Sequence, residues 1–218
     1  MDELLALRVA GLPLAVIGDD VIVGYRPNEL SRALGLGIRF QGPGLEETIR
    51  LLGRVPRAVE RAVGDMPDDK LQWQAPGRSR SMQEFTHHIL GTVRNTIRRL
   101  EDDDVPPIED AYAAMAAQSK SYSSFKQIAA FGSEVIDEYT AWEGRQDPRE
   151  LGRRWFKGQD HRTARERLDW ATGHTVHHLR QLYWVLGHGG IQPTDPMPDA
   201  EFPQEYFLSI VSGSGGLF

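Results

Sequence analysis

The sequence predicts a mainly α protein, a four-helix bundle that carries a small N-terminal appendage of one β-hairpin and one helix. Apolar residues recur at helical spacing in four segments, which start near residues 45, 82, 109 and 163. The first 38 residues instead contain two short apolar runs around a glycine–aspartate turn signal at residues 18–20, which is typical of a hairpin. We therefore expect a ββα unit over residues 1–38, a bundle over residues 44–190 and an irregular tail over residues 191–218.

The composition excludes several kinds of protein. The 218 residues carry a formal net charge of −6, which argues against an extended nucleic-acid surface. No apolar run approaches the ~20 residues of a membrane span, and the acidic start lacks the basic segment of a secretory signal. The chain has no cysteine, so disulfides, thiolate metal ligands and cysteine nucleophiles are excluded. We expect a cytoplasmic protein that acts on a small-molecule substrate and binds neither nucleic acid nor membranes.

The predicted hairpin is formed by two apolar runs, residues 12–17 and 21–24, of which the second is rich in β-branched residues. Pro27 then precedes a short helical segment, residues 28–34, and Gly35 follows its end. Proline near the start of a helix and glycine just after its end are the usual order of these two residues. The unit is therefore strand, turn, strand and helix.

Residues 11–30 resemble the C-terminal half of a glutaredoxin. In that family Pro13 would be the cis-proline before the third strand, and Gly24 and Tyr25 would end the hairpin. The family's first half, with its CxxC motif, is absent, and a chain without cysteine cannot perform thiol–disulfide chemistry. The resemblance therefore implies half of a thioredoxin-like fold. Because a two-stranded hairpin is marginally stable by itself, we expect it to pack on the bundle or to pair its edge with another chain, which predicts a homodimer.

The first and third segments of the predicted bundle each contain a residue that disturbs helices. Residues 45–63 have a helical apolar stripe that Pro56 interrupts, which predicts a kink. Residues 109–142 contain no proline and read as one long helix or as two, which would divide at Gly132. Residues 143–162 are expected to be a connector.

The second and fourth segments begin with the same capping signal. Ser81 with Glu84, and Thr163 with Glu166, match the capping box in which a hydroxyl and a carboxylate bond each other's backbone N–H groups. We therefore expect the second helix over residues 82–100 and the fourth to begin after Thr163.

Histidines gather on these two helices. His174 and His178 are one turn apart on one side of the fourth helix, where both imidazoles can reach one metal ion. His178 falls on the buried face, His174 at its edge, and His177 about 100° away on the outer side. On the second helix, His87 and His88 flank the apolar stripe on opposite sides, and periodicity does not choose between them. A buried imidazole must be hydrogen-bonded or ligated, so the inward-facing pair is either two core histidines or part of a metal site.

Residues 81–89 and 174–182 resemble the DinB/YfiT-like family of metal-binding four-helix bundles, and the resemblance covers the whole predicted bundle. The family has a serine on its second helix with a histidine seven residues on, which selects His88. It also has a His-x3-His ahead of Arg and Gln-Leu on its fourth helix, which selects His174 and His178. The resemblance implies a divalent metal, usually zinc or nickel, held by three imidazoles with open water positions. Several members are thiol-dependent transferases or isomerases that use a low-molecular-weight thiol as a cofactor.

The chemistry of this donor set agrees with the resemblance. Neutral imidazoles suit Zn²⁺ and Ni²⁺, and three protein ligands plus water is the open arrangement of catalytic sites. Candidates for holding the rings by their other nitrogen are Glu84, Asp169 and Gln181. No catalytic residue can be assigned, but there are two candidates. His161, in the connector, could reach the open face of the site, and Arg180 is either a contact for a substrate anion or part of a surface ion pair.

Two functions fit these residues. The first is a metal-dependent thiol S-transferase or isomerase, in which a low-molecular-weight thiol supplies the sulfur that this cysteine-free chain lacks. The alternative is a non-catalytic, metal-stabilised protein, a stress-related binding or scaffold protein. A labile water on the metal favours the first function, and a coordinatively closed site favours the second.

Overall fold

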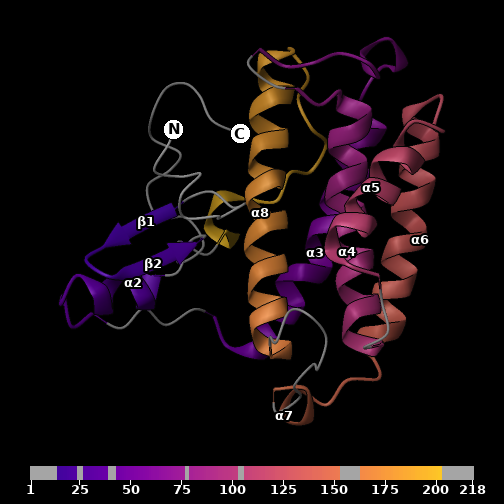
Figure 1. Cartoon of the computed structure of the whole chain (residues 1–218). Coiled ribbons are helices and arrows are strands. Elements are labelled where there is room, and N and C mark those ends of the chain that lie inside the picture. The colour runs from indigo at the N-terminus through magenta and orange to yellow at the C-terminus, as the bar shows by residue number, and fades with distance from the viewer. Residues whose placement is uncertain are drawn as a thin grey trace. The chain divides into compact units, whose positions relative to one another are not determined.

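The computed structural model describes residues 14–23, 27–38, 43–76, 79–102, 106–152 and 163–202. The chain divides into two compact units, Met1–Gly42 and Pro43–Phe218 (Figure 1). Four positions that carry predictions lie outside the described residues: Pro13, Gly24, Tyr25 and His161.

The first unit contains the predicted hairpin and helix. Strand β1 (Leu14–Ile17) pairs antiparallel with β2 (Asp20–Val23), and the turn between them contains Gly18 at a φ of +59°. Helix α2 (Pro27–Ala33) contacts β2, and Ile22 is buried. The expected order of strand, turn, strand and helix is confirmed, whereas the likeness to a glutaredoxin stays a prediction.

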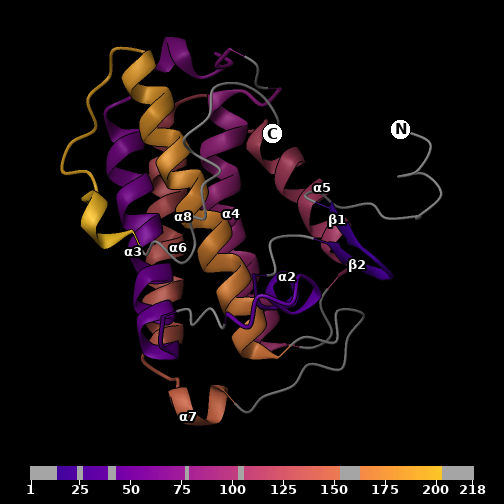
Figure 2. The same cartoon turned by 90° about the vertical axis from the view of Figure 1, so that its left-hand side faces the viewer.

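The second unit is a helical bundle built from four long helices: α3 (Leu45–Gly64), α4 (Met82–Glu101), α6 (Phe125–Glu143) and α8 (Ala164–His188). Helices α3 and α4 each pack against both α6 and α8, as Figures 1 and 2 show from two sides. The largest fully buried side chains come from all four helices and include Leu51, Leu90, Tyr139, Trp142 and Leu168. The predicted mainly helical fold with a small N-terminal sheet is confirmed.

The third segment divides at a different place from the one predicted. Helix α5 (Ile108–Ser119) packs on α4, and α6 begins after Ser124, whose side chain accepts a hydrogen bond from the backbone N–H of Gln127. Gly132, the predicted dividing point, lies inside α6, where a Cβ would stand 3.5 Å from a Leu90 methyl group. The expectation of a break at Gly132 is wrong, because α6 continues through this glycine, where a Cβ would make only ordinary van der Waals contacts.

The remaining elements are short. Helix α7 (Pro148–Leu151) lies within the expected connector, and 3₁₀ helices occupy Asp68–Lys70 and Asp199–Glu201. Helix α3 runs without interruption through Pro56. In the tail, Met197 and Phe202 are buried in the core, and the Met197 N–H donates to the Tyr183 hydroxyl at 3.0 Å. The described part of the tail therefore packs on the bundle.

Both predicted capping boxes are confirmed. The Ser81 and Thr163 side chains each accept from the third backbone N–H of their helix, and Glu84 and Glu166 accept from the backbone N–H groups of those two cap residues. These reciprocal bonds fix where α4 and α8 start, and so fix the phase of every side chain that follows.

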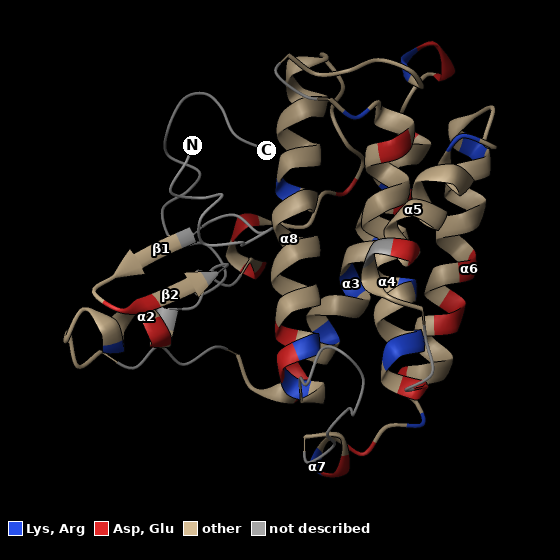
Figure 3. Cartoon of the chain, in the orientation of Figure 1, with Lys and Arg blue, Asp and Glu red and all other residues tan. Residues whose placement is uncertain are grey.

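Charged side chains avoid the middle of α4 and α8. Neither residues 85–93 nor residues 170–179 contain Asp, Glu, Lys or Arg, and the charges of α8 gather in its first turns (Figure 3). Among the helices of the described residues, none combines the length and apolar character that crossing a membrane requires. The histidines of α4, and all those of α8 except His188 at its end, lie in these uncharged stretches.

Candidate metal centre

Three histidines from two helices meet inside the bundle. His88 comes from α4, and His174 and His178 come from α8; one ring nitrogen of each lies within 4.8 Å of the others. The Nε2 atoms of His88 and His174 are 3.0 Å apart. The His174 and His178 ring centres lie 4.4 Å apart with planes at 88°, and the His88 ring is edge-on to both. The structure therefore brings together the three histidines that the sequence singled out.

The burial of the cluster follows from helix geometry. His88 and His178 are only 8% exposed, and His174, at the edge of the buried face, is half-buried. His174 and His178 are four residues apart, which stacks them on one side of α8. The His-x3-His spacing thus supplies one half of the cluster, and the facing turn of α4 supplies the other.

The surroundings keep the rings of His88 and His174 neutral. Burial, reinforced by the positive charge of Arg80 and by neighbouring histidines, lowers the pKa of His88 to about 3. Burial, together with His178 and His88, lowers the pKa of His174 well below its ordinary value. A protonated imidazole cannot ligate a metal, so these shifts leave lone pairs available at neutral pH.

Gln181 orients the cluster from outside. Its Oε1 lies 2.8 Å from His178 Nδ1, so the ring donates there and keeps the lone pair of Nε2. The amide nitrogen of Gln181 in turn donates to His177 Nε2 at 2.6 Å. Of the other two residues predicted for this role, Glu84 caps the start of α4 and Asp169 pairs with an arginine one turn away on α8.

Aromatic side chains surround the histidines. The Trp170 indole is stacked on the His174 ring, with centres 4.9 Å apart and planes at 18°. The Phe85 ring contacts His178 edge-on at 5.5 Å, and the Tyr112 ring lies 5.6 Å from that of His88. These rings exclude water from the sides of the cluster, which strengthens any electrostatic interaction within it.

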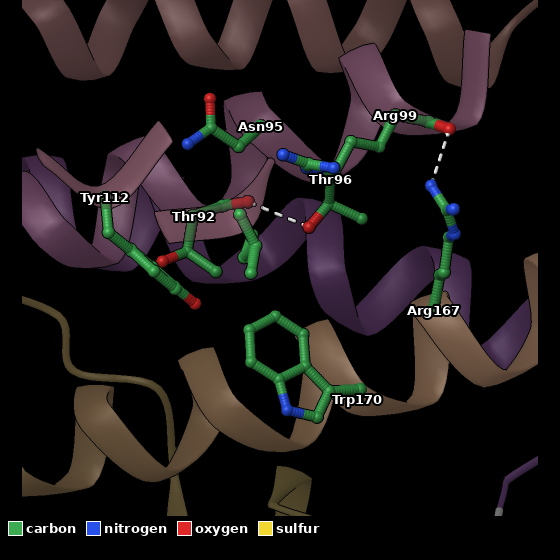
Figure 4. A pocket seen from close by; sticks show the side chains of 8 residues that line it. Thr92, Asn95, Thr96, Arg99, Tyr112, Arg167 and Trp170 are labelled. Atoms are coloured by element: carbon green, nitrogen blue, oxygen red, sulfur yellow. Dashed lines mark hydrogen bonds between the residues drawn. The ribbon is translucent and has the colours of Figure 1, made fainter. Parts of the chain in front are cut away.

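A cavity of about 210 Å³ adjoins the cluster, between α4, α5 and α8. Trp170 and Tyr112, which contact the histidines, also line this cavity (Figure 4). The complete lining among the described residues is Thr92, Asn95, Thr96, Arg99, Ile108, Tyr112, Arg167 and Trp170. None of the three histidines lines this cavity, and Tyr112 and Trp170 separate it from the rings of His88 and His174.

The donor set fits a metal ion. Two nitrogens bound to one tetrahedral Zn²⁺ lie about 3.3 Å apart, because Zn–N bonds are about 2.0–2.1 Å long. The His88–His174 separation of 3.0 Å is close to this value, and no separation in the cluster exceeds 4.8 Å. The separations in the cluster are therefore compatible with three nitrogens around one ion.

Other residues singled out from the sequence lie elsewhere. The Arg180 guanidinium lies 5.6 Å from the centre of the Phe202 ring, and His188 Nδ1 lies 2.8 Å from the Trp184 carbonyl oxygen. His87 is buried on the other side of α4, stacked on Phe131 at 4.6 Å. Of the two adjacent histidines, only His88 joins the cluster.

Sequence reasoning missed most of the cavity. Trp170 is exposed, and its indole is stacked on His174 while it also lines the cavity. A helical spacing of three and four residues relates Arg167, Trp170, His174 and His178, and this pattern could have indicated one shared face. Arg99 and Tyr112 had no comparable signal, because their place depends on how α4 and α5 pack.

The fold and the cluster together define a class of protein: a helical bundle in which two facing helices present three histidines beside a small cavity. The model of the DinB superfamily matches residues 51–182, which is more than half of the chain and includes all three histidines. The chain belongs to the DinB superfamily. No curated protein and no solved structure matches it. The family predicted from the histidine motifs is confirmed.

Proposed function

We propose that this chain is a divalent-metal-binding enzyme of the thiol S-transferase or isomerase kind, with His88, His174 and His178 as its metal ligands. The observation that carries the proposal is the meeting of three imidazoles from α4 and α8 beside a cavity of small-molecule size. Three imidazole ligands suit zinc or nickel and leave coordination positions for exogenous groups. Membership of the DinB superfamily supports the same reading.

The bound ion would supply a Lewis-acid centre that lowers the pKa of a coordinated water or thiol to about 7. The chain's own residues position and enclose this chemistry. Gln181 fixes the tautomer and orientation of His178, and Trp170 covers one face of His174. The sequence has no cysteine, so sulfur for an S-transfer reaction must come from a low-molecular-weight thiol.

Elemental analysis of protein purified without a His tag tests the proposal. We expect about one equivalent of zinc or nickel per chain, and none in a His174→Ala/His178→Ala control. The metal-loaded protein is then assayed with an electrophilic aryl halide and a panel of small thiols. Thiol-dependent turnover that the control lacks is the expected result.

Two results would overturn the proposal. If neither protein binds metal, even after divalent ions are added, the histidines are packed core residues. If the metal binds but no thiol supports turnover, the non-catalytic binding or scaffold function becomes the better interpretation.

A further inference from the structure

Helix α5 forms one wall of the cavity and contacts the cluster through the ring of Tyr112. We propose that α5 is a movable wall, and that its opening admits small molecules from the cavity to His88 and the other two histidines. The proposal rests on the proposed function only in treating the three histidines as the place that those molecules reach.

The inward face of α5 is one stripe of four residues. They follow one another at spacings of three and four, which places them on one side of the helix: Ile108, Tyr112, Met115 and Ser119. Among the described side chains of α5, only Met115 and Ser119 are buried, and both lie in its second half. Ile108 and Tyr112, in the first half, line the cavity. The first half of α5 therefore lies over a cavity instead of a fully packed core.

Met115 is the side chain that holds α5 against α4. Its sulfur lies in the space left by Gly91 of α4, where a Cβ would stand only 2.6 Å from Sδ. Asn95 of α4 donates from Nδ2 to the same sulfur at 3.0 Å. Ser119, the other buried residue, donates its hydroxyl within α5, to the Ala116 carbonyl oxygen at 2.8 Å. Because methionine is a flexible side chain, this contact can be released without disturbing α4.

Two aromatic rings stand between the cavity and the cluster. Tyr112 and Trp170 both line the cavity (Figure 4). Tyr112 lies 5.6 Å from the His88 ring, and Trp170 is stacked on the His174 ring at 4.9 Å. Trp170 belongs to α8, which buries side chains along its whole length, whereas Tyr112 moves with α5. Displacement of α5 would therefore open the way from the cavity to His88.

Both ends of α5 are connected to the bundle, so the helix can open without detaching. Arg99 of α4 donates to the Pro106 carbonyl oxygen just before α5, and residues 120–124 lead from α5 into α6. An element with few buried side chains opens locally at a lower free energy than the core of its domain. The cavity volume of about 210 Å³ has room for a molecule with one aromatic ring, since a cavity of about 150 Å³ binds benzene.

Modification of histidines by diethyl pyrocarbonate, located by mass spectrometry of the metal-free full chain, tests the inference. Gly91→Ala should displace the Met115 side chain and raise the rate of His88 modification by about tenfold, because less free energy is then needed to open α5. His87 is the internal control, since it faces α6 and its rate should not change. Alanine forms helices better than glycine, so the faster modification cannot come from melting of α4.

Gly187→Ala is the matched control variant. A Cβ at this glycine of α8 meets no atom of the described residues within 4 Å, so the rate of His88 modification should stay within about twofold. Hydrogen exchange of the backbone amides is the second measurement. The amides of α5 should exchange at least about tenfold faster than those of α4, and Gly91→Ala should increase the difference.

Zinc binding to the same proteins separates this inference from the proposed function. If the chain binds no zinc but His88 modification depends on Gly91, the proposed function fails and the movable wall stands. If zinc binds but Gly91→Ala leaves His88 modification unchanged, the inference is overturned. It is also overturned if His87 and His88 react faster together, because the whole bundle then opens. Equal effects of the two glycine variants, or exchange in α5 as slow as in α4, would overturn it as well.

Discussion

His87 and His88 are neighbours on α4, yet they face two different helix interfaces. His88 faces α8 and lies beside the imidazoles of His174 and His178 and the ring of Tyr112. His87 faces α6, where Phe131 and Tyr122 cover its ring and neither ring nitrogen makes a hydrogen bond among the described residues. Burial lowers the pKa of both rings. Burial therefore makes both histidines neutral, but only the partners across the interface place His88 among other side chains that could hold a metal ion.

The largest expected effect is on zinc affinity, when His88 and His87 are each substituted in turn. His88→Ala should weaken zinc binding by roughly a thousandfold, since it removes one of three ligands. His87→Phe keeps a ring against Phe131 and should leave the affinity within about threefold. Competition with a chromophoric zinc chelator measures both. Equal losses in the two variants would mean that α4 contributes to binding through its packing and not through His88.

The second effect concerns stability toward acid. Burial lowers the pKa of His87 to about 4, the polar side chain of Gln118 opposes this shift, and the positive charge of Arg94 adds to it. In the unfolded chain, His87 is protonated below its ordinary pKa of about 6.5, whereas in the folded protein it stays neutral down to about pH 4. Above pH 6.5 the ring is neutral in both states, and its contribution to the free energy of unfolding is fully retained. As the pH falls from about 6.5 to 4, up to about 3 kcal/mol of stability is lost.

Urea unfolding of the metal-free protein between pH 7 and pH 4 measures this loss. His87→Phe should show a shallower decline than the unchanged chain, because phenylalanine does not titrate and leaves no unbonded nitrogen in the core. Parallel stability curves for the two proteins would show that His87 is not buried as a neutral ring.

The smallest expected effect on zinc affinity distinguishes Gln181, which contacts His178, from His177, which contacts Gln181. Gln181→Leu removes the acceptor for His178 Nδ1 and should weaken zinc binding by about ten- to a hundredfold. His177→Ala removes the hydrogen bond from the Gln181 amide nitrogen but keeps the one between Gln181 and His178, so zinc binding should weaken less than about tenfold. Competition with the chromophoric zinc chelator measures the zinc affinity of both variants. If Gln181→Leu binds zinc as tightly as the unchanged chain, the orienting role of the amide is wrong.

Local signals in the sequence account for much of the fold. The capping boxes at Ser81 and Thr163 predicted the starts of α4 and α8, because each depends on residues three positions apart. The break between α5 and α6 was missed, although the serines from Ser119 to Ser124 are a loop signal that competes with helix formation. Helical periodicity outweighed that signal on both sides of the break.

The site was predictable only where one helix determines it. His174 and His178 share a face of α8 by their spacing, whereas the choice of His88 over His87 depends on which neighbouring helix packs where. The resemblance to the DinB family supplied that choice. Arg99 and Tyr112 come together through the packing of α4 and α5, which no local pattern encodes.

Helix α8 carries an arginine of the cavity lining and two histidines of the cluster on one continuous element. Arg167 and His174 are seven residues apart, so two turns of helix separate them by about 10 Å. No loop lies between them, and the separation cannot change unless the helix itself unwinds. Helix α8 therefore acts as a rigid spacer between the cavity and the three-histidine cluster. A molecule that contacts both Arg167 and His174 must match this fixed length, and a shorter molecule can contact only one of them.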